Sequence, residues 1–122
     1  MNWIAIIVAV AIVAVFLVIK RAGQISPKDA QDHLKKGAQV IDVRSSSEFS
    51  SGHLPNVINI PLGDIETALP RRVKDKSQVL LLHCHSGMRS AAAMKTLKGM
   101  GYANTFNLGS YSRAESILKQ SE

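Results

Sequence analysis

Apolar and polar positions divide the chain into two parts. Residues 3–19 form an unbroken apolar run without a charged side chain. As a helix this run would rise about 26 Å, close to the ~30 Å hydrocarbon core of a bilayer. Strands rarely reach such a length, so the run predicts a retained transmembrane helix. A cleaved signal peptide and a buried helix are the alternatives.

The charges next to this run predict an orientation. Lys20 and Arg21 follow it directly, with Lys28 nearby, and no Lys or Arg precedes it. The positive-inside rule therefore predicts a single-pass protein of the inner (cytoplasmic) membrane whose later residues face the cytoplasm. The absence of a basic start and of a small-x-small cleavage site disfavours a signal peptide. We expect an anchor with a basic flank at 1–21 and one domain at 22–122.

Beyond the apolar run, short apolar stretches alternate with segments that carry helix caps and helical spacing. Ser26 and Pro27 are a typical N-cap and first helical residue. The alternation predicts an α/β fold with a mostly parallel sheet. The expected strands are residues 39–43, 56–60, 78–83 and 103–108, and the expected helices are residues 26–37, 45–52, 63–69, 89–101 and 112–120.

Composition narrows the classes of function. The chain has 122 residues, a net charge of +6, 5% aromatic residues and one cysteine. Basic residues are not interleaved with aromatic ones, so no nucleic-acid partner is expected. A single cysteine excludes an intrachain disulfide and a four-cysteine zinc site, and it suits a reducing compartment.

That cysteine, Cys84, follows the most apolar predicted strand and precedes a helix. Ligands of open α/β sheets bind at this end of the strands. Gly87 allows a tight loop whose N–H groups converge, and the helix start and Arg89 add positive charge. These features favour the thiolate and predict a nucleophile with a lowered pKa. The alternative is a buried structural cysteine.

Two motifs together resemble the rhodanese (sulfurtransferase) domain. Residues 40–62 resemble its N-terminal signature, and "HCHSGMRS" resembles its active-site loop. The resemblance covers about residues 24–118 and implies a three-layer fold with a five-stranded parallel sheet. The signature positions are Asp42, Arg44, Glu48, Gly52, His53, Pro55 and Pro61.

The resemblance also implies a reaction. Cys84 would take a sulfane sulfur from a small sulfur-containing anion, such as thiosulfate, or from a protein persulfide. The resulting persulfide would pass its sulfur to cyanide, a thiol or a protein cysteine. The loop residues His85, Ser86, Gly87, Met88 and Arg89 would bind the substrate, and Asp42, Arg44 and His53 would support the loop.

Neither a cofactor nor a metal is expected. His83 and His85 flank Cys84, but alternate residues of a strand point to opposite faces. Arg44 and Glu48 are four residues apart at a turn, which predicts an ion pair between them. Asp42 ends a predicted strand and is expected to accept hydrogen bonds from the Cys84 loop.

Other functions stay open. Four residues separate Cys84 from Arg89, one fewer than in tyrosine-phosphatase loops, which disfavours a phosphatase or arsenate reductase. A membrane-tethered persulfide carrier, or a redox-sensing or recruitment module, would use the same residues. The family usually has a second glycine and a tryptophan after the last strand. Here Ser110 follows Gly109, and we expect Tyr111 to fill part of that space.

Overall fold

The computed structural model describes residues 2–121, with side chains described at 2–17 and 23–121. Its centre is a four-stranded parallel sheet in the order β2-β1-β3-β4. Strand β3 is buried at all four positions, as expected for a parallel strand that is covered on both faces. The strands are β1 (Gln39–Asp42), β2 (Val57–Asn59), β3 (Leu80–His83) and β4 (Thr105–Gly109).

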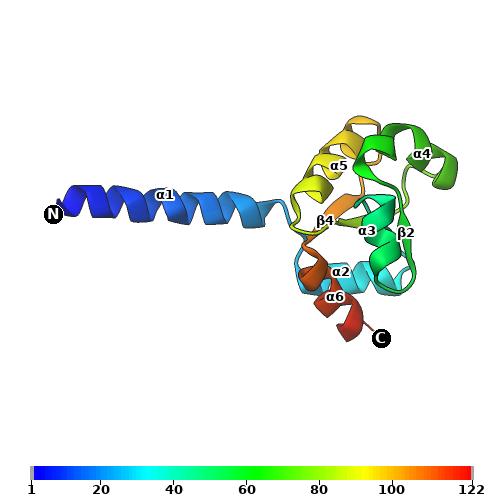
Figure 1. The fold of residues 1–122 in the computed structure, drawn as a ribbon, viewed down its shortest axis with the longest axis horizontal. Helices are drawn as coiled ribbons and strands as arrows, with labels where there is room; N and C mark the ends of the chain where they lie inside the picture. Colours follow the sequence, from blue (N-terminus) through cyan, green and yellow to red (C-terminus); the bar gives the residue numbers. More distant parts are fainter. Residues whose placement is uncertain (1, 122) are drawn as a thin grey trace.

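Helices cover both faces of the sheet (Figure 1). One face carries α4 (Ile65–Arg72) and α5 (Met88–Gly99), which pack with Leu80 and Leu82 of β3. The opposite face carries α2 (Pro27–Lys35) and α6 (Tyr111–Gln120), which pack with Leu81. The short α3 (Ser46–Ser51) and a 3-10 turn, η1 (Leu62–Asp64), connect the strands. The α/β class and the parallel sheet are therefore confirmed.

The implied fifth strand is wrong for the described part of the chain. Beside β4 a single parallel bridge joins Gln24 to Asn107, and the N–H of Ile25 donates to the Asn107 carbonyl at 3.0 Å. The chain then enters α2, with Ser26 as N-cap and Pro27 at its start. Because proline has no N–H to donate and its φ suits a helix, the extended segment ends after this one bridge.

Helix α4 passes through the proline that was expected to follow it. It begins at Ile65 and ends at Arg72, with Pro70 inside. The missing N–H costs one main-chain bond. The last turn is nevertheless closed by the N–H of Val73, which donates to the carbonyl of Leu69 at 2.8 Å. Leu69 is fully buried, so packing outweighs the local preference for a helix end.

The apolar run forms the helix α1 (Trp3–Ala22), which extends away from the layered part (Figure 1). Within residues 2–121 no helix meets the length and apolarity that a membrane crossing requires. The predicted anchor at 1–21 is therefore unsupported, and the predicted inner-membrane localisation is wrong. The side chains of Lys20 and Arg21, which set the orientation, lie outside the described set.

Candidate active site

Cys84 is the first residue beyond β3, at the carboxyl end of the sheet. Its side chain continues the row of Leu80 and Leu82, because alternate residues of a strand share a face. Its N–H donates to the carbonyl of Gly109 at 3.3 Å, which ties it to the end of β4. The side chain is fully buried.

The loop after Cys84 turns back over its sulfur. Gly87 has φ +96° and is the N-cap of α5, a conformation that glycine adopts without strain. Its N–H donates to Cys84 Sγ at 3.0 Å. The Ser90 hydroxyl donates to the same sulfur at 3.5 Å and lies 3.1 Å from the Gly87 carbonyl. The sulfur therefore lies between a main-chain donor and a side-chain donor.

These donors decide the protonation of the sulfur. Burial favours the neutral thiol and raises its pKa, but hydrogen bonds from Ser90, Gly87 and Ser86 act in the opposite direction. The donors prevail, so the pKa of Cys84 lies below its ordinary value. Hydrogen bonds to the charged form stabilise it, which is the condition for a nucleophilic cysteine.

Two residues of this arrangement were not predicted as site residues. Ser90 lies three positions after Gly87 in the first turn of α5, and that spacing is the signal that could have identified it. Asn107, on β4, donates from Nδ2 to the Gly87 carbonyl at 3.2 Å. Its sequence position, 20 residues from Gly87, gave no such signal.

Arg89 is turned toward α3. Its guanidinium forms a bidentate pair with Glu48, at 2.6 Å (Nη1–Oε1) and 3.0 Å (Nη2–Oε2). Glu48 also closes a capping box with Ser45 at the start of α3. The predicted Arg44–Glu48 ion pair is wrong, because Arg44 precedes the helix and bonds Asp42 instead.

This pair predicts an unusual titration of Glu48. Hydrogen bonds from Arg89 and from the Ser45 main chain hold its pKa at about 2, against an ordinary 4.5. In Arg89→Met the largest of these contributions is lost, and the Glu48 pKa is expected to rise toward 4.5. NMR of the side-chain carboxyl carbon against pH measures both values. An unchanged midpoint in the variant would show that Arg89 is not the main cause.

Asp42 and Arg44 form a second, buried pair on the α6 side of the sheet. Arg44 Nη2 lies 2.8 Å from Asp42 Oδ2, and the same Nη2 donates to the Gly52 carbonyl at 2.8 Å. Asp42 is fully buried and Arg44 is 7% exposed. Among the described contacts, Asp42 does not accept a hydrogen bond from the loop at 85–89. It faces the ring of His83 instead.

The remaining predicted residues lie around this centre. His85, Ser86 and Met88 are exposed, and Met88 is 76% exposed. The N–H of Tyr111 donates to the His85 carbonyl at 3.1 Å, and Ser86 forms a bridge with Ser110. The loop is thus joined at two points to the start of α6.

His53 and Tyr111 have different environments. The His53 ring stacks on Phe49, with centroids 3.8 Å apart, and Nδ1 lies 2.9 Å from the Phe49 carbonyl. These contacts place it in the turn after α3 and not against Cys84. The Tyr111 ring lies 4.9 Å from the Arg44 guanidinium carbon and edge-on to His83 at 5.7 Å. It therefore packs on the buried ion pair.

Replacing Gly87 by alanine should distort this loop. A Cβ there would lie 3.2 Å from two main-chain atoms of Gly109, and the φ of +96° is strained for alanine. We expect a stability loss of about 2–3 kcal/mol and a raised Cys84 pKa. Gly37→Ala is the matched control: φ is +93° but the space is open, so only about 1–2 kcal/mol should be lost. Urea unfolding compares the two, and equal losses would contradict the close approach.

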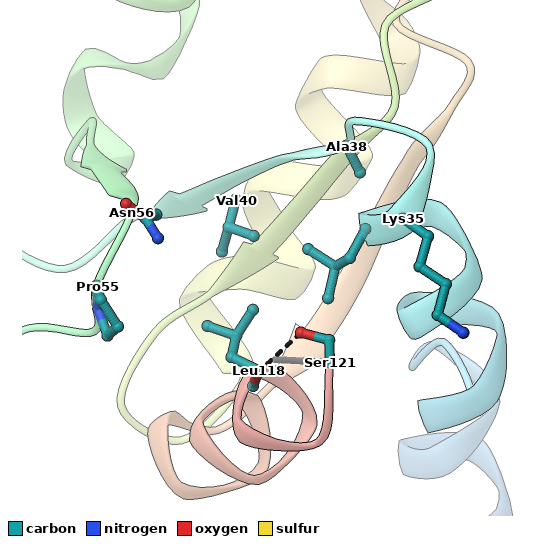
Figure 2. A pocket seen from close by; sticks show the side chains of 8 residues that line it. Lys35, Ala38, Val40, Pro55, Asn56, Leu118 and Ser121 are labelled. Atoms are coloured by element: carbon teal, nitrogen blue, oxygen red, sulfur yellow. Dashed lines mark hydrogen bonds between the residues drawn. The ribbon is translucent and has the colours of Figure 1, made fainter.

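A groove without residues of the Cys84 loop lies between α2, α6, the start of β1 and the segment before β2 (Figure 2). Figure 2 shows the Lys35 side chain extending away from the other lining residues. The Ser121 hydroxyl is already bonded to the Leu118 carbonyl at 2.8 Å. Its lining residues are Leu34, Lys35, Ala38, Val40, Pro55, Asn56, Leu118 and Ser121.

Comparisons with known sequences all indicate the same protein family. The model of the rhodanese-like domain matches residues 26–114. Thiosulfate sulfurtransferase PspE of Escherichia coli is 33% identical over 69 residues, which are 57% of this chain and 66% of that protein. A tRNA sulfurtransferase of Thermoplasma acidophilum is 36% identical over 77 residues, or 61% of this chain and 15% of that protein. The chain thus spans less than two thirds of either relative.

Solved structures agree. The human single-domain sulfurtransferase TSTD1 superposes with a TM-score of 0.64 at 25% identity, covering 80% of this chain and 96% of that one. A rhodanese from E. coli, solved with anions, gives 0.61 at 30% identity over 63% of this chain and 91% of its own. By sequence and by fold, the chain belongs to the rhodanese-like sulfurtransferase family.

Proposed function

We propose that the chain is a sulfurtransferase in which Cys84 carries the sulfur as a persulfide. The observation that carries the proposal is the pair of donors on the buried sulfur, the Gly87 N–H at 3.0 Å and the Ser90 hydroxyl at 3.5 Å. They stabilise an anion at the end of the central strand. Residues 22–122 are proposed as the catalytic domain, and the family match at 26–114 supports this division.

With thiosulfate as donor, the Cys84 thiolate attacks the outer sulfur. A bond forms between Sγ and that sulfur, the sulfur–sulfur bond of thiosulfate breaks, and sulfite leaves with the bonding electron pair. An acceptor nucleophile then attacks the outer sulfur of the persulfide. With cyanide the product is thiocyanate, and with a thiol it is a new persulfide, while the Cys84 thiolate is regenerated in both cases. The step resembles thiol–disulfide exchange and needs no external redox partner.

The loop supplies the charge stabilisation that this chemistry requires. N–H groups of residues 85–89, in the loop and at the start of α5, are proposed to bind the terminal sulfur of the persulfide. Arg89, held by Glu48, is proposed to fix the start of that helix. His85, Ser86 and Met88 would meet donor and acceptor, because they are the exposed residues of the loop. Asp42 and Arg44 are proposed to support the loop from the sheet, and a supporting role of His53 stays a prediction.

Access to the sulfur requires movement of the loop, since Cys84 has no exposed surface. We propose thiosulfate as one donor, which the name of the PspE relative supports, and a thiol or protein cysteine as acceptor. A carrier that loads sulfur but turns over small molecules poorly would use the same first step. The second step therefore separates an enzyme from a carrier.

The test is intact-mass spectrometry of the full chain. Incubation with thiosulfate should add about 32 Da, the mass of one sulfur atom, to form the persulfide. Added cyanide should remove that mass and release thiocyanate. A stable adduct without discharge would favour the carrier. A chain that gains no mass with thiosulfate or with a low-molecular persulfide would overturn the proposal.

A further inference from the structure

The ring of His83 lies between two hydrogen-bond acceptors. Its Nδ1 is 3.3 Å from the carbonyl oxygen of Cys84, and its Nε2 is 3.8 Å from Oδ2 of Asp42. The side chain is completely buried, and Nε2 has no hydrogen-bond partner among the described residues. A buried polar nitrogen without a partner is uncommon and costs free energy, so its position calls for an explanation.

A neutral imidazole can satisfy only one of these acceptors. If the proton is on Nδ1 it bonds the Cys84 carbonyl, and the Nε2 lone pair faces the Asp42 carboxylate. If the proton is on Nε2, the lone pair of Nδ1 faces the carbonyl oxygen of Cys84. Only the imidazolium, with a proton on each nitrogen, could donate to the Cys84 carbonyl and also form an ion pair with the Asp42 carboxylate, whose Oδ2 at 3.8 Å is beyond hydrogen-bond distance.

The other groups around the ring oppose this second proton. Arg44 already pairs with Asp42 at 2.8 Å, and the Tyr111 ring from α6 lies edge-on to His83. Burial is the largest influence on the pKa of His83 and lowers it; Asp42 and the Cys84 carbonyl raise it, and Arg44 lowers it. The net direction is down, so the ring is neutral at neutral pH and gains its proton only at a pH below the ordinary range of a histidine.

We propose that His83 is a positioning residue for sulfur transfer, which takes up a proton between the Cys84 carbonyl and the Asp42 carboxylate and thereby sustains the Cys84 thiolate in acid. The proposal rests on the proposed function, because it concerns the same sulfur. His83 and Cys84 point to opposite faces of the sheet, so the ring acts through the main chain and through its charge. It does not touch the donor.

The direction of the effect follows from the charge. As the pH falls through the pKa of His83, a positive charge appears one residue from the sulfur. A nearby positive charge favours the thiolate, so the reactivity of Cys84 should fall less steeply than that of an isolated thiol. The exposed His85 also flanks Cys84, so every chain compared below, the one called wild type included, carries His85→Gln, which leaves His83 as the histidine beside the sulfur.

The experiment measures alkylation of Cys84 by iodoacetamide in the full chain between about pH 5 and 9. The wild type should show two ionisations, that of the thiol and that of His83. His83→Asn keeps an amide donor near the Nδ1 position but cannot ionise, so it should show one. When each rate in acid is divided by the rate of the same chain at high pH, the value for His83→Asn should be about threefold lower than that for the wild type, or lower still. His33→Gln, on α2, is the control and should match the wild type.

A second measurement keeps the proposal testable if His83→Asn unfolds. Ring ¹⁵N shifts of the wild type report the protonation of His83 directly. The proposal is overturned if His83 stays neutral over the range in which Cys84 reactivity bends, or if His83→Asn retains both ionisations. Alkylation needs no sulfur donor. If the chain forms no persulfide but its alkylation profile still shows the His83 ionisation, the proposed function is refuted and the role of His83 is not.

Discussion

The Cys84→Ser variant is expected to show no gain of about 32 Da with any sulfur donor and no thiocyanate formation above background. A hydroxyl cannot form a persulfide, and its pKa is far too high to supply an anion. Because the chain has one cysteine, another residue cannot take over as sulfur carrier. Intact mass and a thiocyanate assay measure the two losses.

The control for this variant is its fold. Serine can still accept from the Gly87 N–H, which lies 3.0 Å from the sulfur. The circular dichroism spectrum and the urea midpoint should therefore stay close to those of the wild type. A folded Cys84→Ser protein that still gains the mass of one sulfur would remove Cys84 from the proposed role.

The largest loss of stability is expected for Asp42→Ala. It leaves the Arg44 guanidinium, which is 7% exposed, without its carboxylate. Loss of one partner of a buried pair costs about 3–5 kcal/mol, because the remaining charge stays buried and unpaired. Urea unfolding measures this loss, which is a large share of the ~5–15 kcal/mol that stabilises a typical domain.

Two comparisons show whether the buried charge is the cause. The double variant Asp42→Ala/Arg44→Met removes both charges and should recover most of the lost stability. Glu115→Ala removes an exposed carboxylate that lies 3.9 Å from Lys119, and it should cost no more than about 0.5 kcal/mol. An Asp42→Ala loss as small as that of Glu115→Ala would show that the buried pair adds little.

The local features of the fold could be predicted from the sequence, because they depend on short-range rules. Apolar runs with β-branched residues identify the four strands, and Ser26 with Pro27 identifies the start of α2. The position of Cys84 followed from the same pattern, since it comes directly after the most apolar strand. The resemblance to the family's motifs supported the same placement of Cys84.

Long-range partners could not be predicted in the same way. Arg89 pairs with Glu48, 41 residues away, and no periodic pattern links them. The Arg44–Glu48 ion pair was predicted from the i, i+4 spacing of a helix, but Arg44 lies before α3 begins. The i, i+2 rule of extended chain would have indicated Asp42 instead. The fifth strand was carried over from the family, whereas the local sequence at Ser26 and Pro27 already favoured a helix.

The hydrogen bond from the Cys84 N–H to Gly109 has a consequence for how sulfur is delivered. It makes Cys84 an extension of the central strand, the element with the most deeply buried residues. In hydrogen exchange the Cys84 amide should behave like the sheet, while the exposed positions 85, 86 and 88 open more often. The reactive atom is thus held in place while its cover moves. Under the proposed function, a protein that delivers or collects sulfur must therefore extend its own cysteine to a stationary target.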